Sequence, residues 1–333
     1  MIATRLRAIA PLPAQALLKS YWWRASYSYS DWRYRRNQLA VRAEAPTDAE
    51  EYLVRRNPRL IELQKRYTDK AIFTHTFWKD WSQHLDLRHF RSDGQYITQS
   101  GARNPEAQYL GTTAFAEAVD DWRLLESLEE DGLFGCHAYR FAENLVVSRD
   151  LLDSIFEITF LRRSIGLGRT DEFRVLDLGA GYGRFVHRLL NTFPNASATA
   201  VDGVAESTFL CEFYMAFRGL SARATTLPLH QLENLSGQRA DICVNIHSWS
   251  ECTRATVKFW VRLIADLGIR DLLVIPHSSE FLTKEKDGSR DTFLPEITAA
   301  GYRLARKSHK FEGSEALKNN GIAPAWYHLF HSG

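Results

Sequence analysis

The chain has 333 residues, of which 45% are hydrophobic and 25% are charged, a composition that is typical of folded proteins and excludes wholesale disorder. Its 42 Lys and Arg residues against 40 Asp and Glu residues leave a formal charge of +2, so the overall charge gives no reason to expect a nucleic acid as partner. The four cysteines show no CxxC spacing, which indicates reduced thiols in a cytoplasmic protein rather than a disulfide framework or a zinc site, and we expect no bound metal.

The first 165 residues are expected to form a mainly helical region. No apolar run is long enough for a membrane span, and Pro11 and Pro13 interrupt the short apolar pieces at the start, so a cleaved signal is not expected. Tyr, Trp and Arg crowd residues 19–36. Such a segment could lie on a membrane surface, stack on a nucleic acid or hold sugar rings. We favour packing of its aromatic rings onto the rest of the protein, with the arginines reaching solvent.

Apolar residues at helical spacing predict helices between residue 44 and about residue 81, at 114–128 and at 149–163. Pro58 is expected to divide the first of these stretches into two helices, because proline inside a helix removes a backbone hydrogen bond. Residues 92–105 are expected to form loops. No strand is expected in the first half of the chain.

From residue 166 onward, short apolar runs alternate with helices, a rhythm that is typical of a parallel sheet covered on both faces. We therefore expect an α/β fold in residues 166–333, Rossmann-like and doubly wound, with a mostly parallel seven-stranded sheet. Ligands of such sheets bind at the carboxyl ends of the strands. The expected strands are 173–179, 197–202, 222–228, 240–247, 271–277, 302–307 and 325–330, and the expected helices are 184–193, 206–218, 254–267 and 293–300.

A glycine-rich loop follows the first expected strand. Gly179, Gly181 and Gly183 would allow a tight turn and the close approach of a ligand to the backbone. A dinucleotide fingerprint needs its third glycine at position 184, which is Arg184, so this G-x-G-x-G pattern counts against NAD and FAD. The second strand ends at Asp202, whose carboxylate could accept both ribose hydroxyls of a nucleoside.

The run VLDLGAGYG, followed by a helix and by a strand that ends in an acid, resembles the class I S-adenosylmethionine-dependent methyltransferases. The resemblance implies S-adenosyl-L-methionine as cofactor, with Asp202 on its ribose and Asp177 helping to orient its methionine end. A glycine-rich turn in some other α/β domain is the alternative. The cofactor-binding residues implied in this way are Asp177, Gly179, Ala180, Gly181, Gly183, Asp202, Gly203 and Asn245.

Residues 148–163, 179–185 and 244–251 also resemble bacterial sugar O-methyltransferases. This narrower resemblance runs from about residue 131 to the carboxyl end and implies a hydroxyl of a sugar, or of a sugar-containing metabolite or glycan, as acceptor. Ser154 and Glu157 share one side of the helix expected at 149–163 and could reach the site, unless that helix is an ordinary amphipathic one. With Tyr182 and Arg184 of the glycine loop, they are the candidate substrate-binding residues.

Two histidines follow strands whose carboxyl ends face the methyl group in this family's fold. Methylation of a hydroxyl requires removal of its proton, and a neutral imidazole suits that role. His247 is the expected general base, with Glu251 orienting its ring or binding the acceptor, and His277 is the second candidate. Alternatively, each histidine merely makes hydrogen bonds at the end of a strand.

Three functions remain open from the sequence. The first is methylation of a sugar hydroxyl, and the second is methylation of another hydroxyl, such as that of a lipid or polyketide. The third is a non-catalytic methyltransferase fold that acts as a binding module. The intact glycine loop and Asp202 favour the two enzymes, and Asn245-Ile-His-Ser differs from the Asn-Pro-Pro-Tyr of many base-methylating enzymes. The oligomeric state does not follow from the sequence.

Overall fold

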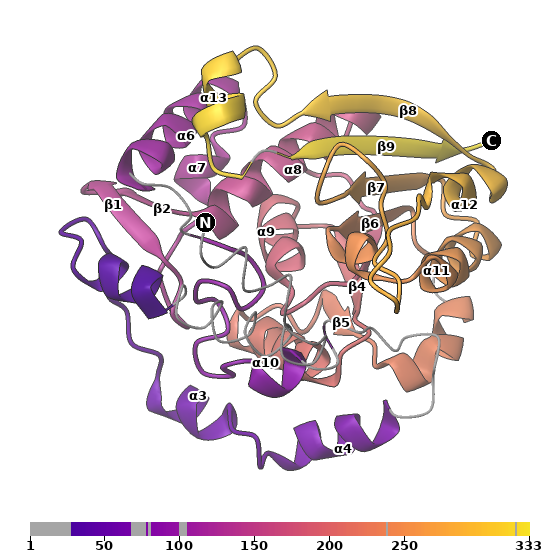
Figure 1. The fold of residues 1–333 in the computed structure, drawn as a ribbon, viewed down its shortest axis with the longest axis horizontal. Coiled ribbons are helices and arrows are strands. Elements are labelled where there is room, and N and C mark those ends of the chain that lie inside the picture. Colours follow the sequence, from indigo (N-terminus) through magenta and orange to yellow (C-terminus); the bar gives the residue numbers. More distant parts are fainter. Residues whose placement is uncertain (1–27, 68–77, 79–80, 100–104, 238, 324) are drawn as a thin grey trace, which may run out of the picture.

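The computed structural model of the protein describes residues 28–67, 78, 81–99, 105–237, 239–323 and 325–333. Its seven-stranded sheet consists of β3 (Arg174–Leu178), β4 (Ser197–Val201), β5 (Ala224–Thr226), β6 (Ile242–Ile246), β7 (Asp271–Ile275), β8 (Tyr302–His309) and β9 (Trp326–Ser332). The strand order is β5-β4-β3-β6-β7-β9-β8 (Figure 1). Neighbours from β5 to β7 are parallel, whereas β9 is antiparallel to both β7 and β8. The expected Rossmann-like, mostly parallel sheet is confirmed.

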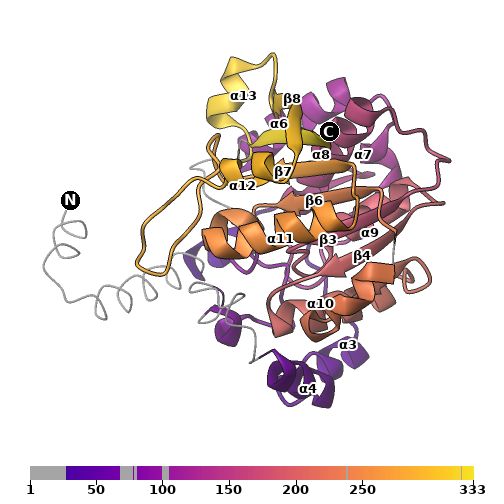
Figure 2. The ribbon, with the colours of Figure 1, turned by 90° about the vertical axis from the view of Figure 1, so that its right-hand side faces the viewer.

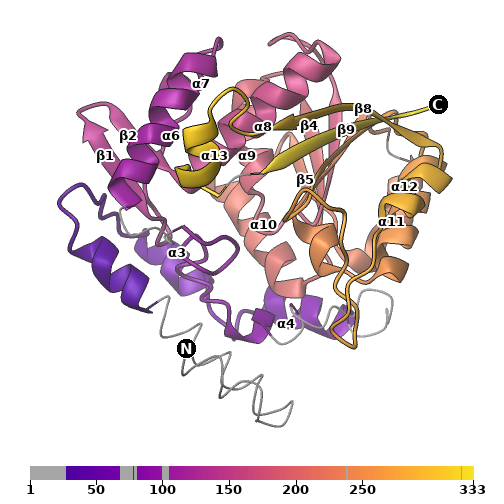
Figure 3. The ribbon, with the colours of Figure 1, turned by 45° about the horizontal axis from the view of Figure 1, so that its top comes forward.

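Helices cover both faces of the sheet (Figure 3). One face packs on α8 (Arg149–Ile165), α9 (Arg184–Thr192) and α10 (Ala205–Phe217), and the other on η3 (Leu229–Gly237), α11 (Arg254–Asp266) and α12 (Leu294–Ala299). Successive strand residues alternate between the two cores, so Val175 faces the α8 side and Leu176 the α11 side. Because both sides are buried, the central strands are almost wholly apolar, as the sequence indicated.

The register of the parallel strands brings their carboxyl ends to one edge. Leu178 at the end of β3 pairs with Val201 at the end of β4, and Ile246 at the end of β6 pairs with Ile275 at the end of β7. The connection after β3 runs toward β4 and the connection after β6 runs the opposite way, toward β7, so the topological switch point lies between β3 and β6. The loops that follow these four strands therefore meet.

The N-terminal half contains α3 (Thr47–Tyr52), α4 (Pro58–Arg66), η2 (Ser82–His84), α6 (Pro105–Val119) and α7 (Leu124–Ser127). The break at Pro58 is confirmed: α3 ends at Tyr52, and the Asn57 side chain caps α4 by accepting the Arg59 N–H. Helix α4 lies beside α10 (Figure 2), where Arg59 pairs with Glu212 at 2.5 Å. The core on the α8 side includes residues of both halves, and the division into parts 1–165 and 166–333 stays a prediction.

Two expectations for this half are wrong. The first is the absence of strands, because β1 (Ala138–Ala142) and β2 (Leu145–Ser148) form an antiparallel hairpin. The strands are short, and the turn residues Glu143 and Asn144 lack the glycine that usually marks a tight hairpin, so the pattern was not visible. Packing against α6 and α8 stabilises the hairpin, which would be marginal alone.

The second is the helix expected at 114–128. Helix α6 begins earlier, at Pro105, a residue whose fixed φ suits the first turn of a helix, and it ends at Val119. Arg123 then adopts a left-handed conformation with φ of 57°, and the Asp120 carboxylate accepts the Leu125 N–H at 2.8 Å. The chain therefore turns between α6 and the short α7.

In the second half of the chain, three short helices, η3, η4 (Ser248–Glu251) and α13 (Glu315–Asn320), were not expected either.

The aromatic and basic segment 19–36 is described only from residue 28, and residues 28–35 are helical. Tyr34 is buried, and its hydroxyl donates to the carbonyl of Val41 at 2.6 Å. Trp32 is exposed and carries the Arg36 guanidinium over its ring at 4.3 Å. Residues 19–27 lie outside the described part, as do Ile72 and Phe73 of the expected helical stretch. In the described part of the chain, no helix combines the length and hydrophobicity needed to cross a membrane.

Candidate active site

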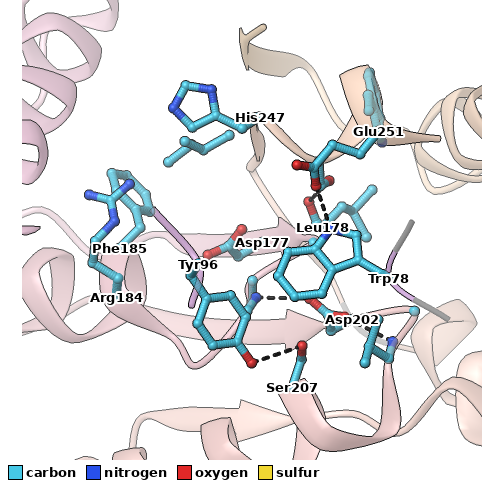
Figure 4. Close-up of a pocket in the computed structure, with 18 of the residues that line it drawn as sticks. Trp78, Tyr96, Asp177, Leu178, Arg184, Phe185, Asp202, Ser207, His247 and Glu251 are labelled. Atoms are coloured by element: carbon cyan, nitrogen blue, oxygen red, sulfur yellow. Dashed lines mark hydrogen bonds between the residues drawn. The ribbon is translucent and has the colours of Figure 1, made fainter. Parts of the chain in front are cut away.

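A pocket opens at the edge where β3, β4, β6 and β7 end (Figure 4). Among the residues selected from the sequence, those that line it are Asp177, Gly179, Ala180, Gly181, Tyr182, Arg184, Asp202, Gly203, His247, Glu251 and His277. Four others, Gly183, Asn245, Ser154 and Glu157, are outside the lining. The fold therefore gathers residues from four separate loops into one site.

The glycine loop between β3 and α9 has a backbone that other residues rarely adopt. Gly179, Gly181 and Gly183 have φ of 81°, 58° and 88°, all in the left-handed region. A Cβ on Gly179 would lie only 2.0 Å from Oγ of Ser248, so that position has no space for a side chain. A Cβ on Gly181 would lie 3.1 Å from the ring of Tyr96, which itself lines the pocket.

Asp202 is joined directly to the glycine loop. Its carboxylate accepts the N–H of Gly181 at 2.8 Å and that of Val204 at 2.9 Å. Burial raises the pKa of Asp202 to about 7 despite these two hydrogen bonds. Burial also raises the pKa of Asp177 to about 7, and the nearby Asp202 adds to that rise. The pocket floor thus holds two carboxyl groups that a cation would stabilise in the ionised form.

Two aromatic side chains from the N-terminal half cover the loop (Figure 4). The rings of Trp78 and Tyr96 stack with centroids 5.3 Å apart, and Tyr96 meets the Tyr182 ring edge-on at 5.3 Å. The Tyr96 hydroxyl lies 3.1 Å from Oγ of Ser207, at the start of α10. The indole N–H of Trp78 donates to Glu251 at 2.5 Å. These contacts connect the acid of η4 to the glycine loop through an aromatic stack.

His247 and His277 lie side by side. The His247 N–H donates to the Ile275 carbonyl at 2.7 Å, with a φ of 66° at His247. Burial and the neighbouring His277 lower the pKa of His247 well below its ordinary value, so this ring is neutral. Nε2 of His277 lies 3.1 Å from a carboxylate oxygen of Glu251. The acid that we expected beside His247 hydrogen-bonds to His277, because η4 turns Glu251 toward β7.

Ser154 and Glu157 come from one face of α8, as expected, and both bind Arg184. The guanidinium donates to Ser154 Oγ at 2.8 Å and to the two Glu157 oxygens at 2.8 and 2.9 Å. Glu157 is buried and Arg184 is partly buried between α8 and α9. In this arrangement Ser154 and Glu157 position Arg184, which lines the pocket, and are not in the lining themselves.

Asn245 and Gly183 support the loop from outside the lining. The Asn245 amide donates to the Leu178 carbonyl and to Ser248 Oγ, both at 2.6 Å, and so ties β6 to the end of β3. A Cβ on Gly183 would lie 2.7 Å from Met215 Cε, so a glycine here lets α9 pack closely on α10.

Sequence reasoning missed Trp78, Tyr96 and Asp150 among the lining residues. Tyr96 is in a segment that had only a loop signal, and Trp78 is in a stretch that had only helical periodicity. Asp150 is in the first turn of α8, where an acid is ordinarily explained by the helix dipole. Its position inside the segment 148–163 was the one available signal. Within the described ranges, no group of three His, Cys, Asp or Glu side chains could hold a metal ion.

No protein-family model and no curated protein matches the chain. Among solved structures, the chain is similar to the mitomycin 7-O-methyltransferase MmcR, with 17% identity and a TM-score of 0.37 over 55% of this chain. The aligned part spans 57% of that enzyme. It is also similar to precorrin-6y C5,15-methyltransferase from Geobacter metallireducens GS-15, with 13% identity and a TM-score of 0.40 over 58% of this chain and 92% of that one. Similarity of this size says nothing about activity.

Proposed function

We propose that the protein is a methyltransferase that uses S-adenosyl-L-methionine to methylate a hydroxyl group. The observation that carries the proposal is the hydrogen bond from Gly181 to Asp202, because it joins the glycine loop and the acid after β4 into one surface under the pocket. A carboxylate in that place can accept the two ribose hydroxyls of a nucleoside. The loop leaves the backbone open to a ligand at the same place.

The residues present fit this cofactor. At Gly181 a Cβ would intrude toward the ring of Tyr96, so glycine leaves space between the loop and the aromatic cover. Asp202 would hold the ribose, and a cationic ligand would favour the ionised form of Asp177, whose pKa is raised to about 7. When bound, S-adenosylmethionine supplies a methyl group on a positively charged sulfur, which a nucleophilic oxygen can accept.

For the proton of the acceptor hydroxyl, the geometry favours His277 over His247. Glu251 hydrogen-bonds to Nε2 of His277, which leaves Nδ1 to accept a proton and places a negative charge beside the imidazolium that forms. Desolvation lowers the pKa of His247, which makes it a weaker base than an ordinary histidine. We assign His277 as the general base, Glu251 as the group that orients it, and His247 as a neutral ring packed against it.

The acceptor class that we propose is a sugar or a sugar-bearing metabolite. The narrower sequence resemblance supports it, and so do the rings of Trp78 and Tyr96 near Glu251, since aromatic faces can pack on the apolar side of a sugar ring while the carboxylate accepts hydroxyls. A non-sugar hydroxyl is the alternative acceptor.

Calorimetric titration of the full chain with S-adenosylmethionine, S-adenosylhomocysteine and NAD tests the cofactor. We expect binding of the first two and none of NAD. Transfer of a labelled methyl group to a panel of sugars, nucleotide sugars and phenolic or lipid hydroxyls then tests the acceptor. Binding without transfer to any compound from a cell extract would favour the non-catalytic binding module, and the absence of binding would overturn the proposal.

A further inference from the structure

Asp150, in the first turn of α8, has a carboxylate of which only one oxygen accepts hydrogen bonds within the protein. It is 1% exposed. One oxygen, Oδ2, accepts the Arg91 Nε–H at 3.0 Å and also the Tyr182 hydroxyl. The other, Oδ1, has no donor among the described residues. A buried acceptor without a donor is costly and rare, so a partner from outside the chain is expected.

The other two acids around Arg91, Glu130 and Asp131, accept hydrogen bonds on both of their carboxylate oxygens. Both oxygens of Glu130 accept from Arg91, and one of them also accepts from Arg188. Asp131 accepts from Arg91 at 3.3 Å and from Arg218 at 2.5 Å. Of these three acids, only Asp150 lines the pocket. The cluster therefore satisfies its inner carboxylates and presents one oxygen to the ligand.

A carboxylate oxygen accepts hydrogen bonds and donates none, so the ligand group at Oδ1 must carry an N–H or O–H, and a cationic ammonium gives the strongest such bond. Asp150 and Asp202 contact adjacent residues of the glycine loop, Asp150 through the Tyr182 side chain and Asp202 through the Gly181 backbone. With Asp202 assigned to the ribose, Asp150 is available for the methionine part of the cofactor, which carries an ammonium group.

We propose that Oδ1 of Asp150 accepts a hydrogen bond from the α-ammonium group of the methionine part of S-adenosylmethionine. This inference rests on the proposed function. Arg91 and the Tyr182 hydroxyl hold the carboxylate in place on its other oxygen, so the acceptor is oriented before the ligand arrives. Asp150 is thus a cofactor-binding residue that no glycine-loop pattern reveals.

The substitution Asp150→Asn tests this hydrogen bond most directly. Because Arg91 and Tyr182 both donate to one oxygen, the amide oxygen of the introduced asparagine keeps that side and its NH₂ group faces the pocket, so an acceptor becomes a donor. We expect binding of S-adenosylhomocysteine to weaken about 10- to 100-fold, as for loss of a charge-assisted hydrogen bond. Binding of 5′-methylthioadenosine, which lacks the amino-acid part, should stay within about threefold.

The matched control is Asp153→Asn, one turn further along α8. Its carboxylate is buried and paired with Arg149 and Lys310, and it does not line the pocket. In this variant the ratio of the two affinities should stay that of the wild type. Thermal unfolding checks that each variant is folded, and a wild-type titration with an S-adenosylhomocysteine analogue that lacks only the amino group gives the same test without mutation.

Equal losses for both ligands in Asp150→Asn, or no loss for either, would overturn the inference while leaving the proposed function intact. An unchanged affinity of the wild type for the analogue without an amino group would do the same. If the wild type binds neither S-adenosylhomocysteine nor 5′-methylthioadenosine, the proposed function itself is wrong.

Discussion

The imidazole rings of His247 and His277 stack with their centroids 4.8 Å apart and their planes 13° from parallel. Desolvation, together with the repulsion between two positively charged rings at this distance, lowers the pKa of His247. The Glu251 carboxylate lies on the His277 side of the pair, and that side chain is half exposed, whereas His247 is partly buried. Of the two rings, His277 is therefore the one that a carboxylate orients.

We predict that His277→Ala lowers kcat by about 10²–10⁴-fold, the usual contribution of a general base. Glu251→Gln should lower kcat less and shift the pH profile of kcat, because the neutral amide no longer stabilises the imidazolium. His247→Ala should change kcat least. Steady-state methyl transfer at several pH values measures all three, and cofactor affinity from calorimetry should stay close to that of the wild type. If His247→Ala proves to be the crippled variant, the base is His247, as the sequence alone suggested.

Asp202→Ala is expected to weaken the binding of S-adenosylmethionine by about 2 kcal/mol, or roughly 30-fold, because two hydrogen bonds to a charged acceptor are lost. The variant also loses its bonds to the Gly181 and Val204 N–H groups. Thermal unfolding is therefore needed to show that the loop remains ordered. A folded variant with wild-type affinity in calorimetry would remove the ribose assignment.

Gly179→Ala is expected to lower the free energy of unfolding by more than about 1 kcal/mol and to abolish cofactor binding. Its φ of 81° is unfavourable for alanine, and the added Cβ would meet Ser248. Gly203→Ala is the control: this glycine also lines the pocket, but a Cβ on it meets no atom within 4 Å. Urea unfolding should show a large loss only at position 179, and Ser248→Gly should partly restore Gly179→Ala.

Stability should depend on pH through Asp177. Its pKa is about 7 in the fold, mainly because of burial, against about 3.9 for an unfolded aspartate. The folded state holds the proton more tightly, so this contribution is complete below about pH 4 and is lost as the pH rises through 7. Between pH 4 and pH 8 the wild type should lose up to about 4 kcal/mol relative to Asp177→Asn. Urea unfolding of both proteins across this range measures the difference, and parallel curves would contradict it.

The sheet was predictable because its signal is local and repeated. Apolar runs such as Leu272–Ile275, whose successive residues enter opposite cores, are typical of a parallel sheet buried on both faces, and the glycines at 179, 181 and 183 mark the turn that follows β3. The hairpin β1–β2 was not predictable in the same way, since four or five residues carry too little periodicity and the turn lacks glycine.

For the site, the sequence located residues that follow strands, because the carboxyl edge of a parallel sheet is a fixed place. It could not assign partners that depend on tertiary packing. Glu251 is four residues from His247 yet pairs with His277, 26 residues away, and Trp78 reaches Glu251 across 173 residues. Such contacts have no spacing rule, so only the folded chain shows them.

The walls of the pocket come from both ends of the sequence: Trp78, Tyr96 and Asp150 from the first half, and the glycine loop with Asp202 from the second. A chimera that joined residues 1–165 of one relative to residues 166–333 of another would exchange part of the cofactor's surroundings along with the cover over the acceptor. Exchanging residues 1–165 would therefore not change the substrate range alone. In such chimeras, acceptor choice and cofactor affinity would change together.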